Sequence, residues 1–203
     1  MQEQNNTNIQ NKNTSSATQK KKEPFAKSFL DQIQIIVVFF AIIVLVFAFL
    51  CKTCKVDGDS MVDTLLNDET VMIWSLFYTP DYGDIVVIHD NQELNKPIVK
   101  RIIGLPGDIV RVEHYSDSMK VKITHSDGSI EELVEDYISY DGAPYFYPQS
   151  KDYTVNEGEV FVMGDNRSYS LDSRSELIGC FDSRQILGKV IFRISPLNKI
   201  GTV

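Results

Sequence analysis

Cysteine and histidine are scarce in this sequence, with three of each among 203 residues. The cysteines are Cys51, Cys54 and Cys180. The first two have the C-x-x-C spacing of redox proteins, but that motif needs a βαβ setting, and here it directly follows an apolar run. We therefore interpret both as small residues at the end of a helix. The histidines, His89, His114 and His125, are not clustered as zinc ligands would be, so we expect no metal and no other cofactor.

Charge is absent from one long stretch. Residues 35–51 read IIVVFFAIIVLVFAFLC, and with Ile33 and Gln34 they approach the roughly 20 residues that cross a bilayer as a helix. A cleavable signal would have a shorter apolar core and a small-residue exit. A lipoprotein would have a small residue before the modified cysteine rather than Leu50, and a buried soluble helix is rarely apolar on every face. These comparisons predict a retained transmembrane helix over 31–52.

Apolar residues are nearly absent from the N-terminus. Residues 1–22 are rich in Gln, Asn, Thr and Ser, so we predict a flexible tail over 1–30. The lysines before the span are Lys12, Lys20, Lys21, Lys22 and Lys27. They outnumber the three acidic residues there, which favours a cytoplasmic N-terminus. Residues 53–203 then form an extracytoplasmic domain on a single-pass protein of the cell membrane.

That domain is acidic and lacks helical periodicity. The chain after Asp31 holds 15 basic and 25 acidic residues, a net charge of about −10, which argues against nucleic acid as a partner. Short runs rich in β-branched residues predict strands at 70–78, 84–90, 97–105, 108–115, 120–124, 159–164 and 188–194. We therefore expect an all-β fold, an antiparallel sheet folded over into a barrel-like arrangement.

One part of the domain is expected to be an insertion. The stretch THSDGSIEEL is typical of a hairpin turn. Residues 131–156 are rich in Tyr and Pro and have weaker periodicity. We place a small β-rich insertion at about 109–156.

No histidine lies near Ser60 in the stretch VDGDSMVDTLL, although a serine hydroxyl needs a base to act as a nucleophile. Lysine is the remaining candidate, and Lys100 lies in the otherwise apolar run PIVKRIIGL. Strand alternation puts Lys100 and Arg101 on opposite faces, so one of the two cations faces inward. If it is Lys100, desolvation lowers its pKa and supplies a neutral amine. Taken singly, Lys100 also fits an exposed strand position and Ser60 a turn.

Several motifs, in order, resemble those of the bacterial type I signal peptidases, membrane-anchored serine proteases with a Ser/Lys dyad. DSMVDTL resembles their nucleophile box, and YGDIVVI the structural strand that follows. VKRIIGLPGD is similar to the lysine box, and FVMGDNRSYSLDSR to the Gly-Asp-Asn-Arg box. The resemblance covers about residues 30–195.

The resemblance implies a catalytic role for each matching residue. Ser60 would attack the scissile carbonyl while neutral Lys100 takes its proton and later gives it to the leaving amine. Ser170 matches the hydroxyl that orients the lysine amine, Met61 would pack beside the nucleophile, and the backbone N–H of Ser60 would form part of the oxyanion hole. The matching support residues are the ion pair Asp172 and Arg174 and the loop residues Gly164, Asp165, Asn166 and Arg167.

The nucleophile box departs from the family at one position, and a second position varies among its members. Asp63 stands where the family usually has proline, and a carboxylate close to Lys100 would raise the lysine pKa; the alternative is that Asp63 points into water. Gly58 stands where some members have a serine that binds the oxyanion and others have glycine. The second oxyanion donor is therefore open.

The resemblance implies removal of signal peptides from exported preproteins at Ala-X-Ala sites. The partners would be signal peptides, the lipid bilayer and the secretion translocon. A non-catalytic scaffold factor for surface protein assembly is the alternative, but such relatives lose the serine or the lysine. A self-cleaving repressor-type peptidase would carry a DNA-binding module instead of the apolar span. A Ser/His/Asp hydrolase would need a histidine base, and the spacing singles out none of the three.

Overall fold

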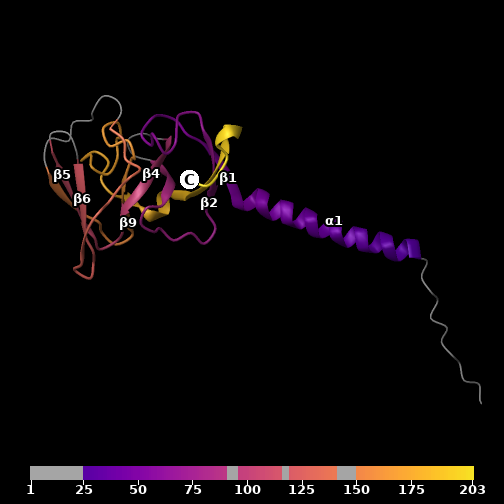
Figure 1. The fold of residues 1–203 in the computed structure, drawn as a ribbon. Helices are drawn as coiled ribbons and strands as arrows, with labels where there is room; N and C mark the ends of the chain where they lie inside the picture. Colours follow the sequence, from indigo (N-terminus) through magenta and orange to yellow (C-terminus); the bar gives the residue numbers. More distant parts are fainter. Residues whose placement is uncertain (1–24, 91–95, 116–118, 141–149) are drawn as a thin grey trace, which may run out of the picture. The chain divides into compact units, whose positions relative to one another are not determined.

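The computed structural model describes residues 25–90, 96–115, 119–140 and 150–203. The chain divides into an N-terminal part that ends at Val44 and a β domain that begins at Leu45 (Figure 1). The flexible tail was predicted over 1–30, and residues 1–24 of it lie outside the described residues. The strands are β1 (Cys51–Lys55), β2 (Thr70–Trp74), β3 (Ile85–Asp90), β4 (Lys96–Gly104), β5 (Ile109–His114), β6 (Met119–Thr124), β7 (Ile130–Glu132), β8 (Lys151–Thr154), β9 (Glu159–Met163), β10 (Phe181–Asp182) and β11 (Ile186–Ser195), with short 3-10 helices η1 (Ser183–Gln185) and η2 (Leu197–Lys199).

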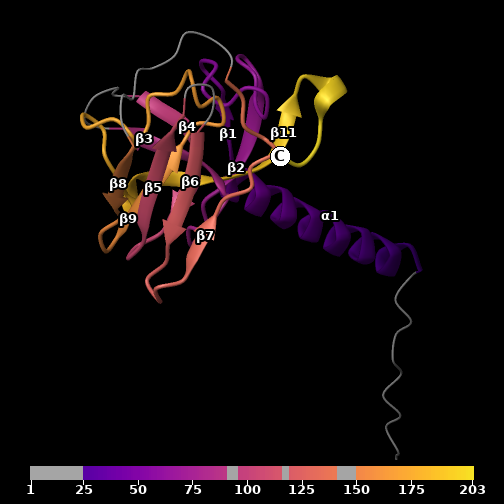
Figure 2. The same cartoon turned by 60° about the vertical axis from the view of Figure 1, so that its left-hand side comes forward.

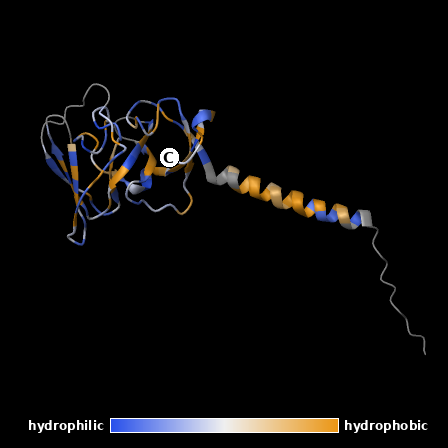
Figure 3. Cartoon of the chain, in the orientation of Figure 1, coloured by the Kyte–Doolittle hydropathy of each residue, from blue (hydrophilic) through white to orange (hydrophobic). Residues whose placement is uncertain are grey.

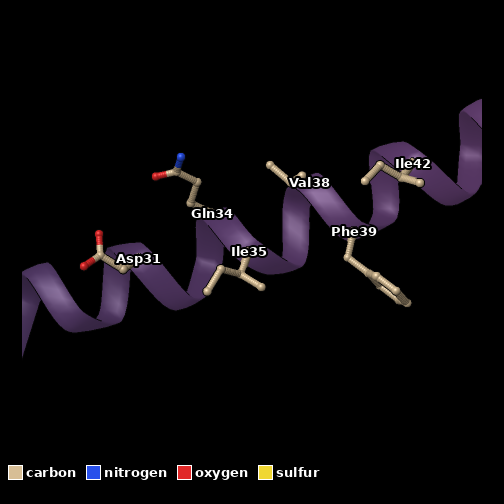
Figure 4. A pocket seen from close by; sticks show the side chains of 6 residues that line it. All are labelled: Asp31, Gln34, Ile35, Val38, Phe39 and Ile42. Atoms are coloured by element: carbon tan, nitrogen blue, oxygen red, sulfur yellow. The ribbon is translucent and has the colours of Figure 1, made fainter.

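The long helix α1 runs from Phe25 to Leu50 and is apolar over most of its length (Figure 3). Its window Phe29–Val46 is long and apolar enough to cross a membrane. Figure 4 shows one side of the helix, where Asp31 and Gln34 precede apolar side chains only. The helix begins before the predicted 31–52 span and includes the last residues of the expected tail.

Cys51 and Lys52 belong to strand β1 rather than to the helix, because their backbones pair with β2 opposite Trp74 and Ile73. The C-x-x-C pair therefore lies in a strand and not at a helix end. Cys54 is partly buried against a core cluster of the β domain, and burial raises the pKa of its thiol.

Seven strands form the larger antiparallel sheet, in the order β1-β2-β11-β3-β4-β9-β10. Strand β11, near the end of the chain, lies between β2 and β3 and so forms a central strand of the sheet. Strand β4 pairs with β3 from Lys96 to Arg101 and with β9 from Arg101 onward, where Arg101 faces Met163. This pairing brings the two sequence motifs with the longest family match side by side.

The smaller sheet has the order β7-β6-β5-β8 and is built from the predicted insertion (Figure 2). The hairpin predicted at THSDGSIEEL joins β6 to β7 and is closed by a hydrogen bond from the His125 N–H to the Ser129 carbonyl. Alternate residues of β5 and β6, such as Val110, Val112 and Val121, are fully buried. They pack with Phe161 and Met163 of β9, so one core cluster joins the two sheets.

The prediction of a mostly antiparallel β domain after one apolar helix is confirmed. Neither sheet closes into a barrel among the described strands, since β1 and β10 are the outer strands of one sheet and β7 and β8 those of the other. All seven predicted strands are present. The first ends at Trp74 instead of Tyr78, because the chain turns at Leu76 and Phe77, where Phe77 has a positive φ of 51°.

Candidate active site

Ser60 lies in a tight turn between β1 and β2. The ends of this turn are tied by hydrogen bonds between the backbones of Val56, Asp68 and Glu69. Met61 and Leu65 are buried in the same core cluster, so they anchor the turn from inside. The buried Met61 side chain thereby fixes the position of its neighbour Ser60, which is partly exposed.

Lys100 faces inward from strand β4, and its side chain is 3% exposed. Its Nζ lies 2.7 Å from Ser60 Oγ, although the two residues are 40 positions apart. Burial lowers the pKa of Lys100 to about 8, while Asp172 and Asp165 oppose the shift and Arg174 adds to it. The surface position considered for Lys100 is therefore wrong, and a neutral amine is accessible near neutral pH.

The segment after β9 wraps around this pair. The Asn166 N–H donates to the Ser60 carbonyl at 3.0 Å, and its side-chain amide donates to the Asp59 carbonyl. Gly164 lies between the Ser60 carbonyl and the Ser170 side chain, and a Cβ atom at Gly164 would collide with both. Only glycine fits this position without a shift of the nucleophile turn.

Asp172 links this segment to a buried cation. Both of its oxygens accept from the Arg174 guanidinium at 2.8 Å, and one also accepts from the Gly164 N–H. Burial alone would raise the pKa of Asp172, but Arg174 and hydrogen bonds from Ser170 and Gly164 bring it below its usual value. Ser170 is fully buried, and its hydroxyl is among the groups that stabilise this carboxylate.

Asp165 joins strand β4 to the nucleophile turn. The Arg101 guanidinium donates to its two oxygens at 2.8 and 2.7 Å, and the Thr64 hydroxyl donates to one of them at 2.5 Å. Arg101 is itself only 12% exposed. The expectation that just one of the two adjacent cations faces inward is too simple, because Arg101 is also largely buried through this ion pair.

The structure thus brings all ten sequence-predicted site residues into one neighbourhood of the β domain. Sequence reasoning assigned no role to Thr64, Arg101 or Glu135. Glu135 forms an ion pair with Arg167, both side chains being nearly inaccessible. The need of a buried Arg167 for a carboxylate partner would have been the signal. Nothing local in the sequence links Arg167 to Glu135, because the two lie 32 positions apart.

Asp63 is exposed at the protein surface. The carboxylates with the largest effect on the Lys100 amine are Asp172 and Asp165. The structure therefore favours the alternative that Asp63 points into water. Gly58 has a φ of +98° and donates its N–H to the Asn67 side chain at 2.9 Å.

His125 has structural surroundings. His125 contacts Tyr82 and lies near Asp108 and Glu131, at one wall of a cavity of about 450 Å³. Among the described residues, no group of three or more His, Cys, Asp or Glu side chains is arranged to hold a metal ion.

A hydroxyl beside a buried amine, in a β domain that presents both from rigid elements, has the chemistry of a serine nucleophile with its base. This is the arrangement that a serine hydrolase needs.

Comparison with known proteins narrows the class. A sequence model of the family described as "Signal peptidase, peptidase S26" matches residues 29–195. A Signal peptidase I of Bacillus licheniformis is 34% identical over 189 residues, which cover 90% of this chain and 97% of the relative. A Signal peptidase I of Streptococcus pneumoniae serotype 4 is 31% identical over 209 residues, covering 87% and 98%. A Signal peptidase IB of Staphylococcus aureus is 34% identical over 185 residues, covering 85% and 93%.

A crystal structure of a signal peptidase I from Enterococcus faecalis V583 aligns at a TM-score of 0.41 with 28% identity, over 56% of this chain and 97% of that one. The match of the family to most of the chain is decisive. The chain belongs to the signal peptidase family, and it is a hydrolase that acts as a signal peptidase I.

Proposed function

We propose that this protein cuts signal peptides from exported preproteins with Ser60 as nucleophile and Lys100 as general base. The observation that carries the proposal is the 2.7 Å contact between the Ser60 hydroxyl and the buried Lys100 amine. A lysine with a pKa of about 8 has a substantial neutral fraction at physiological pH. Arginine could not serve, because its guanidinium stays protonated.

The reaction proceeds in two halves. Ser60 Oγ attacks the scissile carbonyl carbon as its proton passes to Lys100 Nζ, and the resulting ammonium gives that proton to the departing amine. Water then attacks the acyl-serine ester, with Lys100 accepting a proton from the water and returning it to Ser60 Oγ as the ester bond breaks. The Ser60 backbone N–H supplies one hydrogen bond to the oxyanion.

Five further residues keep the pair in place. The Asn166 N–H holds the Ser60 carbonyl, and Gly164 leaves the room that this carbonyl needs. Arg174 neutralises Asp172, whose carboxylate the Ser170 hydroxyl also stabilises. These groups support the reacting atoms without exchanging protons with the substrate. Asp165 and Arg167 belong to the same loop and pair with Arg101 and Glu135.

The preprotein binds as an added strand. Among the described strands, β9 pairs with β4 only from Arg101 onward, so Ile98 and Val99 have an open backbone on that side. A peptide extended there presents alternate side chains to the protein, which suits small residues at the first and third positions before the cut, the Ala-X-Ala pattern. Val99 and Met61 belong to one buried apolar cluster, which suits small apolar side chains at these positions.

Helix α1 anchors the enzyme in the cell membrane with the N-terminus in the cytoplasm. Its support is the hydrophobic run that Figure 3 shows and the lysines that precede it in the sequence. The catalytic domain then faces the side on which signal peptides emerge, beside the bilayer and the secretion translocon.

The decisive experiment is cleavage of a preprotein carrying an Ala-X-Ala site by the detergent-solubilised full chain, with the product ends identified by mass spectrometry. The parent should cut after the second alanine, and Ser60→Ala and Lys100→Ala should each lose at least about 1000-fold in rate. Lys151→Ala, which removes an exposed lysine from β8, is the matched control and should cut like the parent. A folded parent that cuts no preprotein would support the scaffold alternative, and cutting by Lys100→Ala would require another base.

A further inference from the structure

The segment Glu135–Ser139, which we call the strap, crosses from the smaller sheet to the catalytic loop Gly164–Arg167. It follows β7, belongs to the predicted insertion, and matches none of the motifs that carry the family resemblance. Its backbone is bound to the loop on both sides of Asn166. The Ser139 N–H donates to the Asp165 carbonyl at 2.8 Å, and the Arg167 N–H donates to the Ser139 carbonyl at 2.7 Å.

A buried ion pair forms the second connection. The side chains of Glu135 and Arg167 are 5% and 0% exposed, and both Glu135 oxygens accept from the guanidinium. Arg167 Nε in turn donates to the Gly164 carbonyl at 3.2 Å. A guanidinium buried this deeply needs its carboxylate, so Glu135 determines where Arg167, and through it Gly164, can lie.

Tyr137 makes the third connection. Its hydroxyl donates to Glu135 at 2.8 Å, and its ring lies 3.9 Å from the Arg101 guanidinium carbon. Arg101 holds the two oxygens of Asp165. One aromatic side chain thereby supports both cations that flank the loop.

The loop touches the reacting residue directly. The Asn166 N–H binds the Ser60 carbonyl, and Gly164 fills the space between that carbonyl and Ser170. We propose that Glu135 and Tyr137 are positioning residues that hold the catalytic loop, and through it Ser60, in line with the Lys100 amine. This inference rests on the proposed function, and it assigns the insertion a part in the turnover of any bound preprotein.

The test compares steady-state kinetics of full-length Glu135→Gln with those of Glu132→Gln. Glu132 lies three residues earlier and pairs with Lys120 at the surface, so it is a matched control. We expect Glu135→Gln to lower kcat by about 10- to 100-fold with KM changed less than about twofold, because a small misplacement of reacting atoms slows chemistry while the peptide edge of β4 is untouched. Glu135→Asp, which keeps the charge, should recover part of the loss.

A second variant separates positioning from folding. In the double variant Glu135→Met/Arg167→Leu both buried charges are gone, so its thermal midpoint should be near that of the parent. It should still turn over slowly, since the Arg167 hydrogen bond to Gly164 is missing. A double variant that is both stable and fully active would overturn the proposal.

The remaining outcomes are equally clear. A kcat for Glu135→Gln equal to that of Glu132→Gln, or a loss confined to KM, would also overturn the role of the strap. Either result would leave the proposed function intact as long as the parent cuts and Ser60→Ala does not. A parent that fails to cut contradicts the proposed function itself.

Discussion

At the scale of single residues, the burial of Lys100 has opposite consequences for folding and for chemistry. An ammonium group loses hydration when it is buried, which disfavours the charged form. The same penalty brings the pKa of Lys100 to about 8 and makes the amine usable as a base. The hydroxyl that it would activate lies 2.7 Å away.

The pH dependence of cleavage follows from this shift. The active form needs a neutral amine, so kcat/KM should rise about tenfold per pH unit below pH 8 and level off above it. Asp63→Asn should have the same midpoint, since Asp63 is exposed and the carboxylates that act most strongly on Lys100 are Asp172 and Asp165. The measurement is a pH–rate profile of both proteins. A midpoint displaced by the Asp63 substitution would show that this carboxylate reaches the lysine.

Gly164 is a second residue whose identity is decided by its neighbours. In Gly164→Ala the new methyl group would meet the Ser60 carbonyl and the Ser170 hydroxyl, so the nucleophile turn must move. We expect a fall in kcat of about 100-fold, as a shift of about 1 Å in reacting groups produces. Kinetics of Gly164→Ala can be compared with Gly128→Ala, a hairpin glycine with open space around it but a strained φ of +85°. Normal turnover by Gly164→Ala would contradict the close packing of Gly164 against Ser60 and Ser170.

At the scale of elements, strand β4 is the scaffold of the site. It presents Lys100 to Ser60 and Arg101 to Asp165. Because β4 lies inside the sheet between β3 and β9, the backbones of Lys100 and Arg101 are held rigidly by the flanking strands.

Removing Arg101 should therefore be costly. Arg101→Ala would leave the Asp165 carboxylate, which is 0% exposed, without its cation, and we expect a loss of about 3–5 kcal/mol in the free energy of unfolding. Arg111→Ala on β5 breaks a pair whose side chains are about half exposed, and it should change stability very little. Denaturant titration of the two variants in detergent gives the comparison. Equal stability would mean that Asp165 finds another partner.

At the scale of the whole molecule, the chain combines an apolar helix with an acidic β domain. The helix carries the apolar surface that is long enough to cross a membrane, and the β domain carries Ser60 and Lys100. The chain after Asp31 has a net charge of about −10, and a net charge this far from zero favours solubility.

The proposed orientation predicts the outcome of protease protection. In protoplasts, an external protease should digest residues 53–203, while a tag at the N-terminus stays intact until the membrane is permeabilised. Replacing Lys20, Lys21, Lys22 and Lys27 by glutamine should lower the fraction of molecules with this orientation. A tag that is cleaved in intact protoplasts would reverse the assignment of the two sides.

Much of the fold could be predicted because its signals are local. An uncharged run of this length forms a helix, and seven runs of β-branched residues became strands. Strands β1, β7, β8 and β10 were not among the predicted strands, since CKTCK, IEE, KDYT and FD are short or lack an apolar alternation and become strands through their partners. The turn at Leu76 and Phe77 was also missed, because an apolar run along the sequence does not show where the strand ends.

The sequence by itself determined the apolar helix, the β class and, through its motifs, the family and the residues to examine. Only the tertiary structure decided that the Lys100 amine is buried beside Ser60 and not exposed to solvent. It also decided that Arg101 pairs with Asp165 and that Arg167 pairs with Glu135. These are contacts between residues far apart in the chain. Spacing along a sequence contains no distance in space, so burial, pKa and ion pairing arise only when the sheets assemble.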